Sequence, residues 1–179
     1  MIISVEEAKE HITTTVKDSV LEAKLQAIES MVRKRTNNTF VVPNFRFRCQ
    51  IMAQKAYIRH ENIPGLLNVG DTVQISQSVY NDGIYVIKSI DEEGYIELDK
   101  LLIDESEILL SKVEYPMDVK MGVLNLLQWD LENRGKVGVA SETISRHSVT
   151  YFNMDGDNSA MGYPKSLMGF LKPYMKARF

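Results

Sequence analysis

Residues 116–134, with the sequence PMDVKMGVLNLLQWDLENR, carry the strongest helix signal in the chain. Pro116 suits the first helical position, where a missing N–H costs no hydrogen bond, and Asp118 lies where the helix dipole favours an acid. Gly122 allows close approach of another backbone, and Gly135 is a suitable stop. The apolar residues recur at helical spacing and form one broad face: Val119, Val123, Leu124, Leu126, Leu127 and Leu131. We therefore expect a long helix that is buried against other helices.

Two more helices are predicted before residue 43. Ser4 and Glu7 have the spacing of a capping box, which predicts a short helix over residues 5–12. A second helix is expected to be capped by Asp18 or Ser19, since Ser19 and Glu22 repeat the capping-box spacing. Its apolar stripe is formed by Leu21, Leu25, Ile28 and Val32. It ends in a basic triplet, residues 33–35, which complements the negative end of the helix dipole. A phosphate-binding patch is the alternative interpretation of that triplet.

The hydrophobic period changes from 3.6 to 2 after Pro43. Phe45, Phe47, Cys49 and Ile51 alternate with polar residues, as in a strand with one buried face. Further strands are predicted at residues 73–75, 84–87, 95–98 and 108–113. The Asn-Asp-Gly sequence at 81–83 predicts a hairpin turn joining residues 79–80 to the strand that follows. Five or so short strands within about 70 residues predict a small antiparallel barrel.

Together these patterns predict an α+β fold. A small helical bundle, formed by residues 1–43 and 113–179, is interrupted by an inserted antiparallel β-barrel of SH3-like or OB-like type, residues 44–112. The inserted segment carries seven Lys or Arg and eleven Asp or Glu, whereas the whole chain has a net charge of −3. The excess negative charge is therefore concentrated in the predicted barrel.

Composition narrows the class of protein. A pI near 5.7 argues against general binding to nucleic acid. The single cysteine excludes an internal disulfide, and the N-terminus lacks the features of a signal peptide. No stretch approaches the roughly 18 apolar residues of a membrane span. We expect a protein made in the cytoplasm, without membrane contact.

No catalytic or metal-binding constellation is evident. His11, His60 and His147 are far apart in sequence, and Cys49 lies in an alternating strand, where a buried apolar role is expected. Residues 155–159 share two aspartates with a calcium loop, but the positions that follow do not match. We therefore expect no catalytic residues, no metal and no cofactor, and a protein that is not an enzyme.

Three tyrosines of the predicted barrel suit a second interpretation. Tyr80, Tyr85 and Tyr95 have the aromatic character needed to stack on bases. The excess of acids in the same segment opposes binding to phosphates, so hairpin packing is the preferred explanation.

Residues 141–151 alternate hydroxyl and other polar groups and offer few large apolar side chains. Such an extended segment builds no core of its own, so it is either a loop or a tongue completed by a neighbouring subunit. The residues assigned to this inter-subunit segment are Ser141, Thr143, Ser145, Arg146, His147 and Tyr151.

The C-terminus is basic and aromatic, with no acid after residue 157. Aromatic residues often dominate protein contacts, whereas exposed charges mainly set association rate and salt dependence. The predicted docking residues are Lys172, Tyr174, Lys176, Arg178 and Phe179. A frayed terminus is the alternative.

The order and spacing of several segments resemble the head–tail connector proteins of tailed bacteriophages. The matching segments are SVEEAKEHI at 4–12, the next helix through residues 28–32, YPMDVKMGVLNLLQWDLENRGK at 115–136, SETISRHSVTY at 141–151 and YPKSLMGFLKPYMKARF at 163–179. The chain departs from the pattern between Pro43 and Tyr115, where simpler connectors have a short link. Residues 70–90 themselves look like small barrels of phage head-completion and tail proteins.

The resemblance implies a structural protein of the virion neck, made in the cytoplasm of the host bacterium. It implies a homo-oligomeric ring, dodecameric in relatives, that binds the portal protein and a head-completion or stopper protein. DNA would be only passing cargo, and no membrane would be involved. The C-terminal docking residues would then bind the portal, with the barrel as the alternative contact. Two other functions stay open: a nucleic-acid-binding module that uses the barrel, and an enzyme with an unrecognised site.

Overall fold

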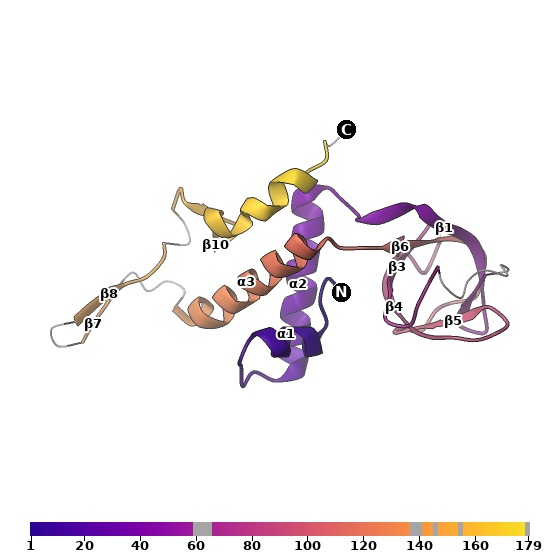
Figure 1. The fold of residues 1–179 in the computed structure, drawn as a ribbon, viewed down its shortest axis with the longest axis horizontal. Coiled ribbons are helices and arrows are strands. Elements are labelled where there is room, and N and C mark those ends of the chain that lie inside the picture. Colours follow the sequence, from indigo (N-terminus) through magenta and orange to yellow (C-terminus); the bar gives the residue numbers. More distant parts are fainter. Residues whose placement is uncertain (59–65, 137–140, 145–146, 154–155, 178–179) are drawn as a thin grey trace. The chain divides into compact units, whose positions relative to one another are not determined.

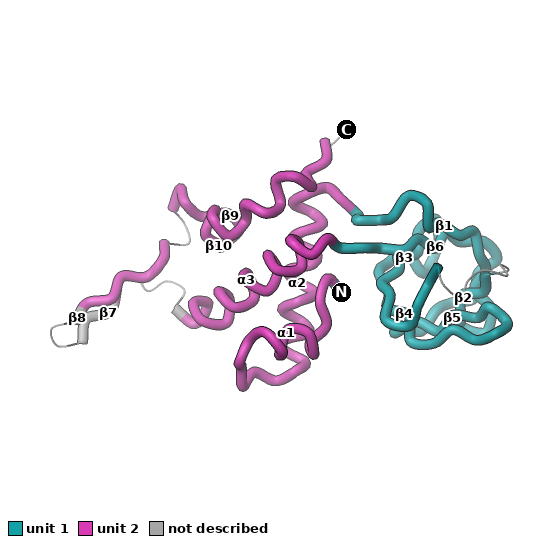
Figure 2. The backbone as a smooth tube through the Cα atoms, viewed as in Figure 1, with its two compact units in different colours: residues 1, 39–115 teal, residues 2–38, 116–179 magenta. Residues whose placement is uncertain are grey.

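The computed structural model describes residues 1–58, 66–136, 141–144, 147–153 and 156–177. The chain forms two compact units, shown in different colours in Figure 2. The barrel unit contains Met1 and Thr39–Tyr115, and the helix-containing unit contains Ile2–Asn38 and Pro116–Phe179.

The barrel unit is a closed antiparallel barrel of six strands (Figure 1). The strands are β1 (Val41–Met52), β2 (Lys55–Tyr57), β3 (Thr72–Ser76), β4 (Gly83–Ile90), β5 (Tyr95–Leu98) and β6 (Glu105–Val113). Their order around the barrel is β1-β2-β5-β4-β3-β6. Closure through the β1–β6 pair leaves no free sheet edge, which removes a site for uncontrolled strand pairing.

The alternation predicted for the first strand is confirmed. Cys49 and Ile51 are buried, while Arg48 and Gln50 between and beside them are exposed. Inward side chains from all six strands fill the barrel, including Ala56, Val73, Ile87, Ile96 and Leu110. β1 begins at Val41, before Pro43. The register shift between Val41 and Arg46 leaves Pro43 outside the paired positions, so its missing N–H costs no ladder hydrogen bond.

The hairpin predicted at residues 81–83 is wrong in detail. β3 ends at Ser76 and pairs directly with β4, so residues 79–80 lie in the connecting loop and not in a strand. Asn81 is buried, and its side chain bonds to Ile103 and Glu105 instead of forming a tight turn.

The helix-containing unit holds α1 (Val5–His11), α2 (Asp18–Thr36) and α3 (Met117–Asn133). The capping box predicted for the first helix is present, because Ser4 and Glu7 exchange side-chain-to-backbone hydrogen bonds. The N-cap predicted for α2 at Asp18 or Ser19 is wrong, because the helix already begins at Asp18 and its N-cap is Lys17, which makes no side-chain capping bond. The stripe Leu21, Leu25, Ile28 and Val32 is buried, as expected.

α3 buries the face predicted from its sequence. Val119, Val123, Leu126 and Leu127 are almost fully buried against α2 and the C-terminal segment. The close approach at Gly122 involves an aromatic side chain and not a backbone. A Cβ at Gly122 would lie 2.5 Å from ring atoms of Phe170, so the missing side chain makes room for that ring.

The chain after α3 contains little α-helix. It forms a short 3-10 turn, η1 (Arg134–Lys136), and two small sheets, β7 (Ser141–Ile144) with β8 (His147–Thr150) and β9 (Ser159–Ala160) with β10 (Tyr163–Pro164). A 3-10 helix, η2 (Lys165–Tyr174), follows and packs on α3 and α2. The sequence predicts a short α-helix at residues 166–171, and η2 takes its place.

The predicted fold class, an α+β helical bundle interrupted by a small barrel, is wrong. The structure is mostly β and is built on the closed six-stranded barrel, and only 35% of the described residues are helical. The C-terminal part adds two-stranded sheets and a 3-10 helix instead of bundle helices. Pro173 lies inside η2 and lacks the N–H that an α-helix interior requires, and Gly169 weakens helix further, which explains the difference in this segment.

Among the residues that the structure describes, no helix has both the length and the apolar character needed to cross a bilayer.

Candidate interaction surfaces

The C-terminal segment is fixed to the ends of α2 and α3 by hydrogen bonds. The Tyr174 hydroxyl donates to the Asp118 carboxylate, with O–O distances of 2.7 and 2.8 Å. The side-chain amides of Asn37 and Asn38 donate to the backbone carbonyls of Ala177 and Tyr174, at 2.8 and 3.2 Å respectively. The Lys176 N–H donates to the Thr36 carbonyl at 2.7 Å. The Lys176 bond occupies one carbonyl group that the end of α2 would otherwise leave to solvent.

This arrangement brings three of the five predicted docking residues together. Lys172 and Lys176 are exposed, and Tyr174 is half-buried against Asp118. Arg178 and Phe179 lie outside the described residues. The Asp118 contact raises the pKa of the Tyr174 hydroxyl, because the neutral phenol is the form that donates the hydrogen bond. The segment therefore presents its lysines from a fixed backbone.

A buried carboxylate ties α2, α3 and β10 together. Asp130 forms ion pairs with Lys24 and with Arg134, whose Nε is 2.6 Å away, and accepts a 3.3 Å hydrogen bond from the Tyr163 hydroxyl. Burial alone would raise the pKa of Asp130, but the bonds and charges of Lys24 and Arg134 outweigh it and hold the pKa below its usual value. Arg134 also lies over the rings of Trp129 and Tyr163. Every charge in this cluster has a partner, so we assign it to stability.

Residues 141–144 and 147–150 form a two-stranded antiparallel sheet rather than a loop. β7 and β8 pair in register from Ser141 with Thr150 to Ile144 with His147. Ser141 and Val149 are exposed. For Thr143 in β7 and His147 in β8 the structure describes the backbone but not the side chain, and Tyr151 directly follows β8. The predicted residues Ser145 and Arg146 lie outside the described part of the chain. An isolated two-stranded hairpin is marginally stable in water, so this one gains from a partner.

One end of the barrel carries three loops that are bonded to one another. We call it the barrel rim: the turn Ala53–Gln54, the loop at 77–82 and the loop at 99–104. The Asn81 amide pairs with the Ile103 backbone in both directions, at 2.8 and 2.9 Å, and also donates to Glu105. Glu105 accepts bonds from Ser78 and from the Val79 N–H. These bonds lower the pKa of Glu105, because they favour its charged form.

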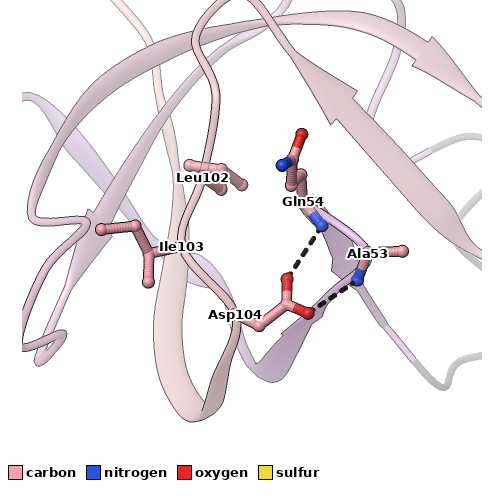
Figure 3. Close-up of a pocket in the computed structure, with 5 residues that line it drawn as sticks. All are labelled: Ala53, Gln54, Leu102, Ile103 and Asp104. Atoms are coloured by element: carbon pink, nitrogen blue, oxygen red, sulfur yellow. Dashed lines mark hydrogen bonds between the residues drawn. The ribbon is translucent and has the colours of Figure 1, made fainter.

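Asp104 ties the third loop to the Ala53–Gln54 turn, as Figure 3 shows. Its carboxylate accepts the backbone N–H groups of Ala53 and Gln54, at 3.2 and 2.9 Å. Both residues have positive φ, 51° and 64°, so the turn carries a backbone conformation that side-chain-bearing residues rarely adopt. A hollow of about 440 Å³ lies here, lined by Ala53, Gln54, Leu102, Ile103 and Asp104.

The rim exposes large apolar side chains. Leu101 is 84% exposed, Val79 78% and Tyr80 67%, and Met52 and Ile103 are also exposed. Hydrogen bonds fix the backbones of these loops, so the apolar groups are presented from an ordered scaffold. Sequence analysis missed this surface, because the Asn81, Asp104 and Glu105 contacts join residues that are 22 to 51 positions apart.

Within the part of the chain that the structure describes, the residues considered for chemistry are not assembled into a site. Burial raises the pKa of the Cys49 thiol to about 12, which keeps it protonated and unreactive at neutral pH. His11 is exposed at the end of α1, and His60 lies outside the described residues. Across the described ranges, no three His, Cys, Asp or Glu side chains are grouped as a metal site.

The three tyrosines weighed for base stacking do not form a platform. Tyr85 is buried and donates its hydroxyl to the Asn81 carbonyl at 2.8 Å, whereas Tyr95 packs on Tyr57. Tyr80 is the exposed member of the three.

No family model matches the chain, and no curated protein sequence matches it significantly.

Proposed function

We propose that the chain is a structural subunit of a tailed-bacteriophage virion: a head–tail connector that forms a ring beneath the portal and links the head to the tail. Its site of action would be the virion neck, after synthesis in the host cytoplasm. The proposal starts from the order and spacing of the segments that resemble connectors. In this role the chain is not an enzyme, and its partners are further copies of itself, the portal and a head-completion or stopper protein.

The observation that carries the proposal is the hairpin β7–β8. Within the described residues β7 and β8 pair only with each other, and Val149 projects an exposed aliphatic side chain. Unpaired strand edges of this kind are completed when a second chain adds a strand or covers the apolar side. A neighbouring subunit in a ring is the partner that fits this requirement.

The C-terminal segment is the proposed portal contact. Lys172, Tyr174 and Lys176 are held by the bonds to α2 and α3, so docking would require little further ordering of the backbone. The predicted contributions of Arg178 and Phe179 are part of the same proposal.

The barrel gives a nucleic-acid-binding role less support. Residues 44–112 have four more acids than bases, which repels phosphate. In the connector role, DNA passes through the assembled ring without being recognised by this chain. Salt-dependent binding of the purified protein to duplex DNA would favour the alternative.

Amide hydrogen exchange tests the ring proposal. We expect the amides of β7 and β8 to exchange rapidly in dilute monomer and at least about tenfold more slowly in the assembled protein, because pairing with a neighbour protects them. The barrel strands β3 and β6 serve as an internal control, since their ladders are complete within one chain. Equal exchange of β7 and β8 in both states would contradict the proposed subunit contact.

A further inference from the structure

The barrel rim has the properties of a protein-docking surface. Five exposed apolar residues lie on its loops or beside its turn: Met52, Val79, Tyr80, Leu101 and Ile103. The loops are held by the Asn81, Asp104 and Glu105 bonds, so little conformational entropy remains to be lost on binding. The core of the barrel is formed by other residues, so the exposure of these five side chains is not explained by the packing of the barrel.

The negative charge of the rim indicates which kind of partner it would bind. Asp82, Asp99 and Asp104 lie on its loops with one base, Lys100, and residues 39–115 as a whole carry seven Lys or Arg against twelve Asp or Glu. An acidic surface disfavours DNA and favours a basic protein surface. The apolar groups within it require apolar groups on the partner as well.

A surface of matching chemistry occurs on the helix-containing unit. We call it the basic corner: Arg33, Lys34 and Arg35 in the last turn of α2, together with Met175. Lys34 and Arg35 are exposed, and so is Met175. Met175 lies beside the end of α2, because the next residue, Lys176, donates its N–H to the Thr36 carbonyl. Residues 2–38 and 116–179 carry fourteen Lys or Arg against twelve Asp or Glu, so the two units have opposite net charge.

We propose that the barrel rim of one copy docks on the basic corner of a second copy. Two different surfaces meet in such a contact, so a pair of copies retains one free corner on the first copy and one free rim on the second, to which further copies can add. Contacts of this head-to-tail kind close into rings when the rotation allows. The inference thus rests on the ring in the proposed function and assigns it a specific contact, with apolar side chains at the centre and charges around them.

Sedimentation velocity over a concentration series tests the contact with matched variants. We expect Val79→Ser and Tyr80→Ser each to weaken self-association about tenfold or more, because central apolar anchors dominate such interfaces. The control is Val69→Ser, the same change at a 65% exposed valine in the turn before β3. It should alter the association constant by less than about twofold. Circular dichroism of each variant verifies that the barrel is still folded.

The other half of the contact has its own test. Lys34→Glu with Arg35→Glu should weaken association, whereas Lys17→Glu, at an exposed lysine before α2, should not. Raising the salt concentration from about 0.05 to 0.5 M should weaken the wild-type contact, because ions screen exposed charges.

The outcomes separate this inference from the proposed function. If wild-type protein assembles and both Val79→Ser and Tyr80→Ser assemble equally well, the rim contact is wrong and the ring is unaffected. If wild-type protein stays monomeric at every concentration, both the contact and the ring proposal are contradicted. Loss of portal binding in the rim variants, with self-association intact, would assign the rim to the portal and overturn the proposal.

Discussion

Tyr174 places its hydroxyl between the two carboxylate oxygens of Asp118, at 2.7 and 2.8 Å, and so anchors the C-terminal segment to the first turn of α3. The residues are 56 positions apart. The contact also satisfies Asp118, whose charge already suits the positive end of the helix dipole.

This contact predicts a shifted tyrosine titration. The pKa of Tyr174 is raised by Asp118, so the bond contributes stability below the pKa of a free tyrosine and loses it as pH rises through the folded pKa. Asp118→Asn should move one tyrosine to a lower pKa in an ultraviolet titration. Tyr174→Phe should remove that transition. An unchanged titration in Asp118→Asn would mean that the two side chains do not interact in solution.

The Asp130 cluster predicts a pH-dependent loss of stability. Because the folded pKa of Asp130 is lowered, its contribution is present at neutral pH and disappears as pH falls through that folded pKa. Asp130→Asn should cost about 1–3 kcal/mol at pH 7, the range for hydrogen bonds to a charged group. Urea unfolding at pH 7 and at pH 3 measures both effects, and the difference between the variant and the parent should shrink at pH 3.

Asp18→Asn is the control for this prediction, because Asp18 pairs with Lys9 at the surface and is 68% exposed. It should change stability by less than about 1 kcal/mol. Equal losses for the two variants would contradict the assignment of Asp130 as the buried link.

Replacing Gly122 by alanine adds a single methyl group, which should clash with the ring of Phe170. Gly122→Ala should destabilise the protein by about 1–3 kcal/mol through overpacking against Phe170, less about 1 kcal/mol gained in helix propensity. Gly169→Ala is the control, because a Cβ there would meet nothing within 4 Å. Thermal melts should rank the two, and a Gly122→Ala protein more stable than the parent would show that the ring moves aside freely.

Leu127 tests the buried face of α3. It is 1% exposed, so Leu127→Ala should lower the free energy of unfolding by about 2–5 kcal/mol. Met121 on the same helix is 44% exposed, and Met121→Ala should cost less than about 0.5 kcal/mol. Similar losses for the two variants would mean that the face is assigned wrongly.

Local signals in the sequence predicted several elements correctly. The Ser4–Glu7 capping box, the α2 and α3 stripes and the alternation along β1 all depend on residues within one or two turns or on neighbouring positions in a strand. The barrel was also detectable, because its strands are separated by turn residues.

Features that depend on distant residues were not predicted. The fold class was wrong because prolines and glycines after residue 160 favour 3-10 and two-stranded structure over another α-helix. Asn81 was expected in a tight turn, but its amide is used by Ile103 instead. The attachment of Tyr174 and the clustering of exposed apolar groups on the rim both require knowledge of which segments meet in space.

Electron microscopy of the purified protein, alone and mixed with portal rings, tests the central claim most directly. The connector proposal predicts closed rings of this chain, stacked coaxially on the portal with a central opening wide enough for DNA, and loss of stacking when residues 172–177 are removed. Monomers that neither close into rings nor bind the portal at any concentration would contradict it.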